Sequence, residues 1–272
     1  MRILAFDVEN LPNITSTFKL FDTNISHTNI IENQSLISIS WKFIGKGCKS
    51  GIQSVSIADD PERFKDDIYD DYHVAKTFHE VLNSKDDFVL MGHNLDRFDI
   101  KKFNTSALKH GLCAVPERQS IDTLKQARRK FKLDSNKLDY LARFLGVGEK
   151  IQTGGFQLWN DIVQAKYPAV GKKADPEKTK EAMRRMVLYN KHDVRLLIAV
   201  YEKMKGWIKI PNWTLYNNVV VGCTKCGSKT FCSNGHRYTQ TGKHRRFWCK
   251  SHKGPFDVPA SRVSFFEEAL GL

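Results

Sequence analysis

Asp7 and Glu9 lie two residues apart at the end of a short apolar segment, Ile3–Val8. This segment is rich in strand-forming residues and is followed by Asn10 and Pro12, so it is predicted to form a strand. Because side chains alternate across a strand, both carboxylates would lie on the same face. Neighbouring carboxylates repel each other unless a cation lies between them, and Mg²⁺ and Mn²⁺ prefer oxygen ligands. The pair indicates a divalent-metal site, with a solvated strand end as the alternative.

A second acidic segment, Gly92–Asp99, continues a predicted strand, Phe88–Met91, into a predicted helix. Ligand sites of such sheets lie beyond the strand ends, so Asn94 and Asp99 are candidate site residues. Asp96 is interpreted as the N-cap of the helix, which we expect to begin there. The alternative is that the whole segment is only a helix start with its capping residues.

The third acidic position is Asp193, on a long predicted helix, Pro176–Met204. Tyr189 precedes it by four residues and therefore shares its helix face. The apolar residues Val194 and Leu197 would attach this helix to the core. An inward-facing Asp beside them is costly to bury unless it is paired or bound to a metal. A surface acid on an amphipathic helix is the alternative.

Four of the six cysteines lie in the last fifth of the chain. Two pairs have the spacing of zinc knuckles, Cys223-x2-Cys226 and Cys249-x2-His252. Because they bracket short predicted strands, they favour a Cys3His zinc ribbon with one structural Zn²⁺, which would stabilise a module too small for a large core. Cys232 and His236 are alternative ligands, and either could replace His252.

The formal net charge of the 272-residue chain is +13, which favours a polyanionic partner such as nucleic acid. The segment 217–256 contains eight Lys and Arg residues and no acidic residue. Together with Tyr238, Phe247 and Trp248, these cations suit phosphate contacts and base stacking. Docking onto the rest of the chain or onto another protein is the alternative role for this module.

The order of the predicted elements favours an α/β domain in which helices flank a mixed sheet, because an initial run of strands is followed by alternating helices and strands. We expect this domain over residues 1–209, the basic module over 217–256 and a C-terminal tail over 257–272. No segment has the length and apolar character of a membrane span, and the N-terminus does not resemble a signal peptide. We therefore expect a cytoplasmic protein with no membrane partner.

The three acidic segments occur in the order Asp-x-Glu, Asn-x3-Phe-Asp, Tyr-x3-Asp. This combination resembles the proofreading exonuclease domains of family-B DNA polymerases and the wider DEDD exonuclease superfamily. The resemblance covers about residues 1–205, and the segments Phe6–Pro12, Ser120–Leu124 and Leu138–Ala142 agree with it. It implies an RNase H-like fold, to which the zinc-ribbon-like module would be appended.

The resemblance also implies the metal ligands Asp7, Glu9, Asp99 and Asp193, which would bind two Mg²⁺ or Mn²⁺ ions. Asp96 competes for the third ligand position, but the Phe-Asp pairing favours Asp99. Tyr189 assigns the chain to the Tyr subclass, because Leu188 occupies the position where the other subclass has a His. Tyr189 would orient the attacking water, and Asn94 and Phe98 would position the site or the terminal nucleotide.

The expected function is that of a 3′→5′ exonuclease acting on single-stranded DNA or frayed 3′ ends. A two-metal-ion mechanism would release nucleoside 5′-monophosphates. A polymerase, or another replication or repair protein, would be its partner in trans. One alternative is a non-catalytic nucleic-acid-binding protein on a nuclease scaffold. The other is an RNA-directed exonuclease, since these motifs do not distinguish the 2′-hydroxyl.

Overall fold

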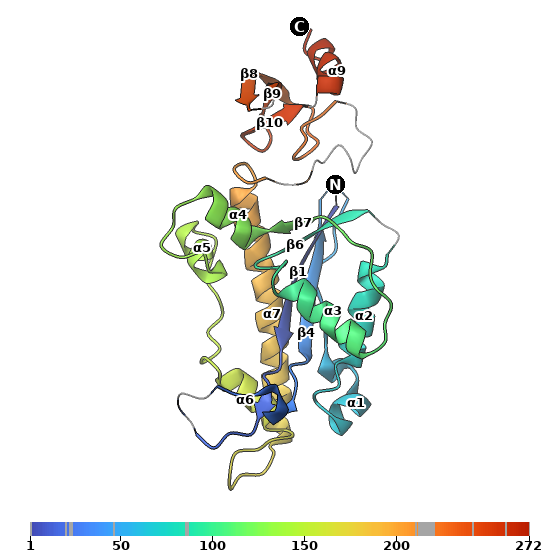
Figure 1. Ribbon diagram of the computed structural model, residues 1–272, viewed down its shortest axis with the longest axis vertical. Coiled ribbons are helices and arrows are strands. Elements are labelled where there is room, and N and C mark those ends of the chain that lie inside the picture. Colours follow the sequence, from blue (N-terminus) through green and yellow to red (C-terminus); the bar gives the residue numbers. More distant parts are fainter. Residues whose placement is uncertain are drawn as a thin grey trace.

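The computed structural model describes residues 2–19, 21, 24–45, 47–84, 87–209, 211, 221–240, 242–258 and 260–271. Its main feature is a five-stranded sheet flanked by helices, with a small three-stranded sheet beyond one end (Figure 1). The expected mixed sheet with flanking helices is therefore confirmed. Among the described residues, no helix has both the length and the apolar character required to span a membrane.

The five-stranded sheet has the order β5-β4-β1-β6-β7. The strands are β1 (Arg2–Asn10), β4 (Leu36–Ile44), β5 (Gln53–Ser56), β6 (Phe88–Gly92) and β7 (Ser120–Asp122). Strand β4 is antiparallel to β1 and β5, whereas β1, β6 and β7 run parallel. A separate ribbon pairs β2 (Ile14–Thr15) with β3 (Ile30–Glu32). The central position of β1 places its side chains between the helices on both faces.

The helices are α1 (Pro61–Asp66), α2 (Tyr72–Leu82), α3 (Asp99–Lys109), α4 (Thr123–Lys130), α5 (Leu138–Phe144), α6 (Gln157–Val163), α7 (Pro176–Met204) and α9 (Val263–Glu268), with short 3-10 turns at His27–Asn29, Ile57–Asp59 and Ala260–Arg262. Helix α7 has 29 residues and runs along one face of the five-stranded sheet (Figure 1). Asp175 caps its first turn by accepting a hydrogen bond from the Lys178 backbone N–H, and Pro176 has the fixed φ suited to that turn.

Alternation along β1 divides its side chains between two hydrophobic clusters. Leu4 and Phe6 pack in the cluster that contains Phe78 of α2 and Phe103 of α3. Ile3 and Ala5 pack in the other cluster, with residues of α5 and the C-terminal half of α7, including Leu141, Val194 and Leu197. The odd-numbered residues of β1 therefore face α7, which determines where the acids at the end of the strand point.

The C-terminal module consists of β8 (Phe231–Thr239), β9 (Gly242–Cys249) and β10 (Gly254–Val258), which form an antiparallel sheet in the order β10-β9-β8. Phe231, Phe247 and Phe256 form its small core together with Phe266 of α9. The ammonium of Lys225 donates a 3.1 Å hydrogen bond to the Gly206 carbonyl just beyond α7. The module thus contacts the end of the long helix.

Candidate active site

Three carboxylates from β1 and α7 converge on one point. Asp7 and Glu9 are odd-numbered residues of β1, and Asp193 lies on the face of α7 that covers this strand. One carboxylate oxygen from each of these residues lies within 4.8 Å of the other two. Side chains almost two hundred residues apart in the sequence are therefore close enough to share a cation.

Asn190 of α7 holds Asp7 in place. Its side-chain amide donates to the Asp7 carboxylate at 2.7 Å and to the Asp7 carbonyl at 3.2 Å. The amide oxygen of Asn190 in turn accepts a 3.3 Å hydrogen bond from the Ser38 hydroxyl of β4. This buried chain of hydrogen bonds fixes the position of α7 relative to β1. No motif or spacing in the sequence points to Asn190 or Ser38 as site residues.

Asp99 approaches Asp7 and Glu9 from the other side of the strand end. It is the first residue of α3, it is buried, and its carboxylate accepts a 3.1 Å hydrogen bond from the Val8 backbone N–H. A position in the first helical turn is favourable for a carboxylate because of the helix dipole. Asp7, Glu9, Asp99 and Asp193, named here the acidic cluster, are thus brought to one end of the sheet.

Burial and mutual repulsion raise the pKa values of the acidic cluster. The pKa of Asp7 lies well above its ordinary value because the residue is buried and because Asp99, Glu9 and Asp193 are close. Burial and the charge of Asp193 raise the pKa of Glu9 to about 8, and burial raises that of Asp99 to about 7. A nearby divalent cation would reverse this effect by favouring the ionised forms.

Lys150, in the segment between α5 and α6, enters the acidic cluster. Its ammonium forms an ion pair with Asp193 and donates a 3.0 Å hydrogen bond to the Tyr189 hydroxyl. Burial lowers the pKa of Lys150, but the charge of Asp193 and the hydrogen bonds to Asp193 and Tyr189 raise it overall above its ordinary value. No spacing in the sequence indicated this residue, because the stretch around it has no regular periodicity.

Tyr189 lies half-buried beside the acidic cluster. Its ring contacts Trp159 of α6 edge to face, with 6.2 Å between the ring centroids. Burial and the charge of Asp193 raise the pKa of Tyr189 above its ordinary value, so its hydroxyl stays protonated near neutral pH. A protonated hydroxyl can orient a water molecule but cannot act as a base.

The expected role of Asp96 as a helix cap is wrong. Helix α3 begins at Asp99 with Phe98 at the N-cap position, and the Asp96 carboxylate instead pairs with Lys125 at 2.7 Å. Asp122, at the end of β7, accepts hydrogen bonds from the backbone N–H groups of Asn94 and Asp96 and thereby holds the loop before α3. The loop needs this support because Asn94 has a φ of 74°, in the left-handed region.

Aromatic side chains surround a cavity beside the acidic cluster. The cavity has a volume of about 250 Å³ and is lined by Val8, Glu9, Asn10, Leu11, Pro12, Gln34, Phe98, Phe156 and Trp159. The rings of Phe156 and Trp159 are stacked with an interplanar angle of 10°. Phe98, which we expected near the terminal nucleotide, is 40% exposed and therefore accessible to a ligand.

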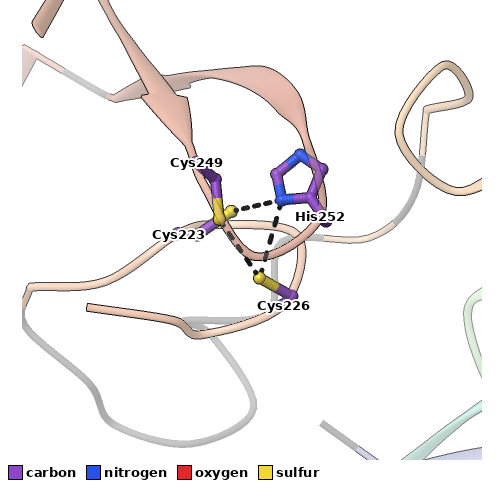
Figure 2. Close-up of side chains that lie close together, drawn as sticks. All are labelled: Cys223, Cys226, Cys249 and His252. Atoms are coloured by element: carbon purple, nitrogen blue, oxygen red, sulfur yellow. Dashed lines mark hydrogen bonds between the residues drawn. The ribbon is translucent and has the colours of Figure 1, made fainter. Parts of the chain in front are cut away.

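The C-terminal module contains a second candidate metal centre, the Cys3His cluster (Cys223, Cys226, Cys249 and His252). Its ligand atoms lie within 4.8 Å of one another, and Figure 2 shows the three thiols and the imidazole pointing toward a common centre. The His252 Nδ1 atom lies 3.3 Å from the Cys223 sulfur, whereas Nε2 is buried with no hydrogen-bond partner. The cluster is compatible with a zinc ion.

The two alternative zinc ligands lie outside the Cys3His cluster. Cys232 is exposed on β8, and its thiol lies 3.9 Å from the carbonyl oxygen of Trp248. His236 is exposed on the same strand. The geometry therefore brings together His252 with the three cysteines of the two knuckles.

Comparison with known proteins gives one family match. The model of the RNase H superfamily matches residues 54–205, which include Asp99, Tyr189 and Asp193. No curated protein matches the chain. Among solved structures, it is similar to the family B DNA polymerase from the hyperthermophilic archaeon Pyrobaculum calidifontis, with 19% identity and a TM-score of 0.47. That match covers 75% of this chain and 24% of the polymerase, so the chain spans about a quarter of it.

Proposed function

Because this chain belongs to the RNase H superfamily, we propose that it is a metal-dependent exonuclease that shortens nucleic acids from the 3′ end. The observation that carries the proposal is the convergence of Asp7, Glu9 and Asp193 within 4.8 Å. Lys150 offsets the charge of Asp193, and a divalent cation would offset the remaining repulsion that raises the pKa values of Asp7 and Glu9. Single-stranded DNA, including frayed 3′ ends, is the proposed substrate, since the chain carries a formal net charge of +13.

The acidic cluster would hold two divalent ions, Mg²⁺ or Mn²⁺. An all-oxygen donor set suits these hard cations. One oxygen of Asp193 is buried without a hydrogen-bond partner, so the protein leaves a ligand atom free there. When bound, the ions would supply Lewis acidity and charge neutralisation at the scissile phosphate.

Tyr189 and Lys150 would position the attacking water. The Tyr189 hydroxyl accepts a hydrogen bond from Lys150, which fixes its place beside Asp193. Because burial keeps this hydroxyl protonated, we assign it an orienting role and no role as a base. The Lys150 ammonium adds a positive charge close to where the phosphate would lie. The proposed product is a nucleoside 5′-monophosphate.

The cavity beside Glu9 would accept the 3′-terminal nucleotide. Phe98, Phe156 and Trp159 line this cavity and offer aromatic surfaces for stacking a base. We assign Asn94 to substrate binding as well, since its loop leads directly to Phe98. This arrangement favours an unpaired terminus, because a cavity of about 250 Å³ is too small for a base pair.

We further propose that the Cys3His cluster binds one structural Zn²⁺ and that the chain divides into a nuclease domain, up to about residue 209, and the C-terminal module. Residue 217, the expected start of the module, lies outside the described residues. Because Phe266 packs in the core of the module, we propose that the segment 257–272 belongs to the same folding unit. A polymerase or repair protein acting in trans is the proposed protein partner.

The proposal is tested by incubating the protein with DNA and RNA strands labelled at either end. With Mg²⁺, a 5′-labelled single strand should give a ladder of progressively shorter products, whereas a 3′-labelled strand should release labelled mononucleotide at once. Without a divalent ion, neither strand should change. Internal cuts from the start, or mononucleotide released first from the 5′ end, would refute the proposed activity. Faster cleavage of RNA than of DNA would mean that RNA, and not DNA, is the substrate.

A further inference from the structure

A groove at the C-terminal end of α7 combines exposed aromatic rings with lysines. It has a volume of about 400 Å³ and is lined by Lys130, Phe131, Lys132, Leu133, Leu141, Phe144, Leu145, Lys203, Met204 and Trp207. We name it the basic groove. Among its lining residues, three are lysines and none is acidic. It lies outside the acidic cluster, and no role proposed above involves it.

The aromatic residues of the basic groove are unusually accessible. Trp207 is 70% exposed and Phe144 is 62% exposed. Trp207 meets Phe131 edge to face at 6.3 Å, and Phe144 lies nearly parallel to Tyr140 at 6.1 Å. These contacts fix the orientation of each exposed ring while leaving a face open. Both rings line the same groove, so they form one exposed apolar patch, and such patches mark interaction sites.

Cations predominate around the basic groove. Arg128 and Arg129 are exposed on the last turn of α4, immediately before Lys130. Of the acidic residues next in sequence to its lining, Glu202 forms an ion pair with Lys205, and Asp134 accepts a hydrogen bond from the Tyr140 hydroxyl. The rim is therefore a cationic surface.

The basic groove and the acidic cluster lie at two levels along α7, beside the face of the helix that α5 covers, and the residues of this face between them are buried. The segment after α5 follows this face: the Glu149 carbonyl contacts His192, and Gly148 lies against Leu196. Met204 then lines the groove. Met204 lies eleven positions after Asp193, which corresponds to about 16 Å along the helix axis. This length equals about five nucleotides at the ~3.4 Å spacing of a stacked strand.

From this arrangement we propose that the basic groove binds the single-stranded nucleic acid upstream of its 3′ end while the terminus occupies the acidic cluster. Lysines at the rim pair with backbone phosphates, and the faces of Phe144 and Trp207 stack with bases without selecting their sequence. The nature of the strand rests on the proposed function, but the binding surface does not depend on catalysis. The site makes the protein prefer strands longer than about five nucleotides.

The test is binding of a fluorescent twelve-nucleotide oligothymidylate in Mg²⁺-free buffer, followed by anisotropy at several salt concentrations. The double variant Lys130→Ala/Lys132→Ala should lower the slope of log K against log [salt] by about 1.4, since each phosphate contact contributes about 0.7 for single strands. Phe144→Ala should weaken binding by about 5- to 100-fold, the range for loss of one stacked base.

Two control variants match these changes. Lys172→Ala/Lys173→Ala removes two exposed lysines just before the opposite end of α7, and Phe265→Ala removes an exposed phenylalanine of α9. Both should bind the oligonucleotide as the unmodified protein does. If the groove variants and the controls gave equal slopes and affinities, the proposed binding surface would be wrong. Loss of self-association in the groove variants, with unchanged oligonucleotide binding, would assign the groove to contact with a second copy of the chain.

Cleavage assays separate this inference from the proposed function. For the active enzyme, the ratio of kcat/KM on a twelve-nucleotide strand to that on a trinucleotide should fall in the groove variants. A protein that binds through the groove but cleaves nothing would refute the nuclease and retain the groove. Normal cleavage with an unchanged length ratio and unchanged binding would retain the nuclease and refute the groove.

Discussion

The acidic cluster and the Cys3His cluster are two candidate metal centres in opposite structural situations. The acidic cluster lies at the end of a sheet whose two hydrophobic clusters contain most of the buried apolar residues. The Cys3His cluster lies in a module whose buried apolar core comprises four phenylalanines, two cysteines and one valine. The first framework is held by its hydrophobic clusters, whereas the second would depend on the proposed ion for its stability.

This difference teaches how each metal would contribute. At the acidic cluster the fold holds carboxylates together against their repulsion, which raises their pKa values and prepares them for a cation. Removing an acid should therefore damage activity and spare the fold. At the Cys3His cluster the ligands replace a missing core, so removing one should damage the fold of the module.

The largest expected effect is the loss of cleavage on removal of one acid. Asp7→Ala or Asp193→Ala should lower the cleavage rate by about 10⁴-fold or more, because a metal-ion site supplies several kcal/mol of transition-state stabilisation. The thermal unfolding temperature should stay the same or rise, since repulsion is relieved. Asp96→Ala, outside the acidic cluster, is the control and should keep its activity. Near-normal Mg²⁺-dependent cleavage by either cluster variant would refute the site assignment.

The next effect concerns the orientation of water. Tyr189→Phe removes only the hydroxyl, and the rate should fall by roughly 10²- to 10⁴-fold. Binding of DNA should hardly change. The matched control is Tyr140→Phe on α5. It removes a hydroxyl that donates a hydrogen bond to Asp134, outside the acidic cluster. An unaltered rate in Tyr189→Phe would mean that another group, such as Lys150, aligns the nucleophile.

Removal of zinc should damage the fold of the C-terminal module and spare cleavage, the reverse of what is expected for the acidic cluster. Purified protein should contain about one zinc per chain, and Cys249→Ser should unfold the C-terminal module, because structural zinc supplies roughly 10–16 kcal/mol of apparent binding free energy. The nuclease domain should stay folded and still cut a short oligonucleotide. Cys232→Ser, at the exposed cysteine, should retain the zinc. Metal analysis and circular dichroism measure both outcomes, and a zinc-free, folded module would contradict the ribbon.

The smallest effect is the pH dependence of stability without divalent ions. The folded pKa of Glu9 is raised from 4.5 to about 8 and that of Asp99 from 3.8 to about 7. Raised values mean that the stabilising contribution is complete below the ordinary pKa and is lost as the pH rises through about 7–8. Bound Mn²⁺ offsets this loss, so it should raise the unfolding temperature by more at pH 8 than at pH 6.

The variant Glu9→Gln is the control for that pH dependence. It removes a carboxyl whose pKa is raised to about 8, so the dependence on pH should become shallower. If Mn²⁺ stabilised the unmodified protein equally at both pH values, the raised pKa values would not describe the protein in solution. Both measurements need only a thermal-shift assay on the full chain.

Much of the fold could be predicted from the sequence, because β1, β4 and α7 have strong periodicity and clear boundaries. The predicted helix Pro176–Met204 matches α7 at both ends, owing to its Asp175 cap and Pro176. The expected RNase H-like fold is confirmed by the family match. The assignment of the metal ligands and of Tyr189 stays a prediction, although the structure brings these residues together.

The remaining site residues could not be predicted because their roles depend on contacts distant in sequence. Lys150 reaches Asp193 from an irregular segment, and Asn190 reaches Asp7 across 183 positions. Asp96 was predicted to be a cap because it stands where the helix was expected to begin, but Lys125, 29 residues later, pairs with it. Local patterns cannot anticipate a partner that only the tertiary fold supplies.

Two glycines determine how the C-terminal module meets the end of α7. A Cβ atom on Gly206 would lie 3.0 Å from the His252 carbonyl oxygen, and one on Gly254 would lie 2.8 Å from the Gly206 carbonyl oxygen. The junction is therefore a close fit of two backbones. A homologous module transplanted onto this helix would need glycine at both positions to seat at the same depth, whatever its linker length. At this junction, a module can therefore be exchanged only if no side chain stands at the positions of Gly206 and Gly254.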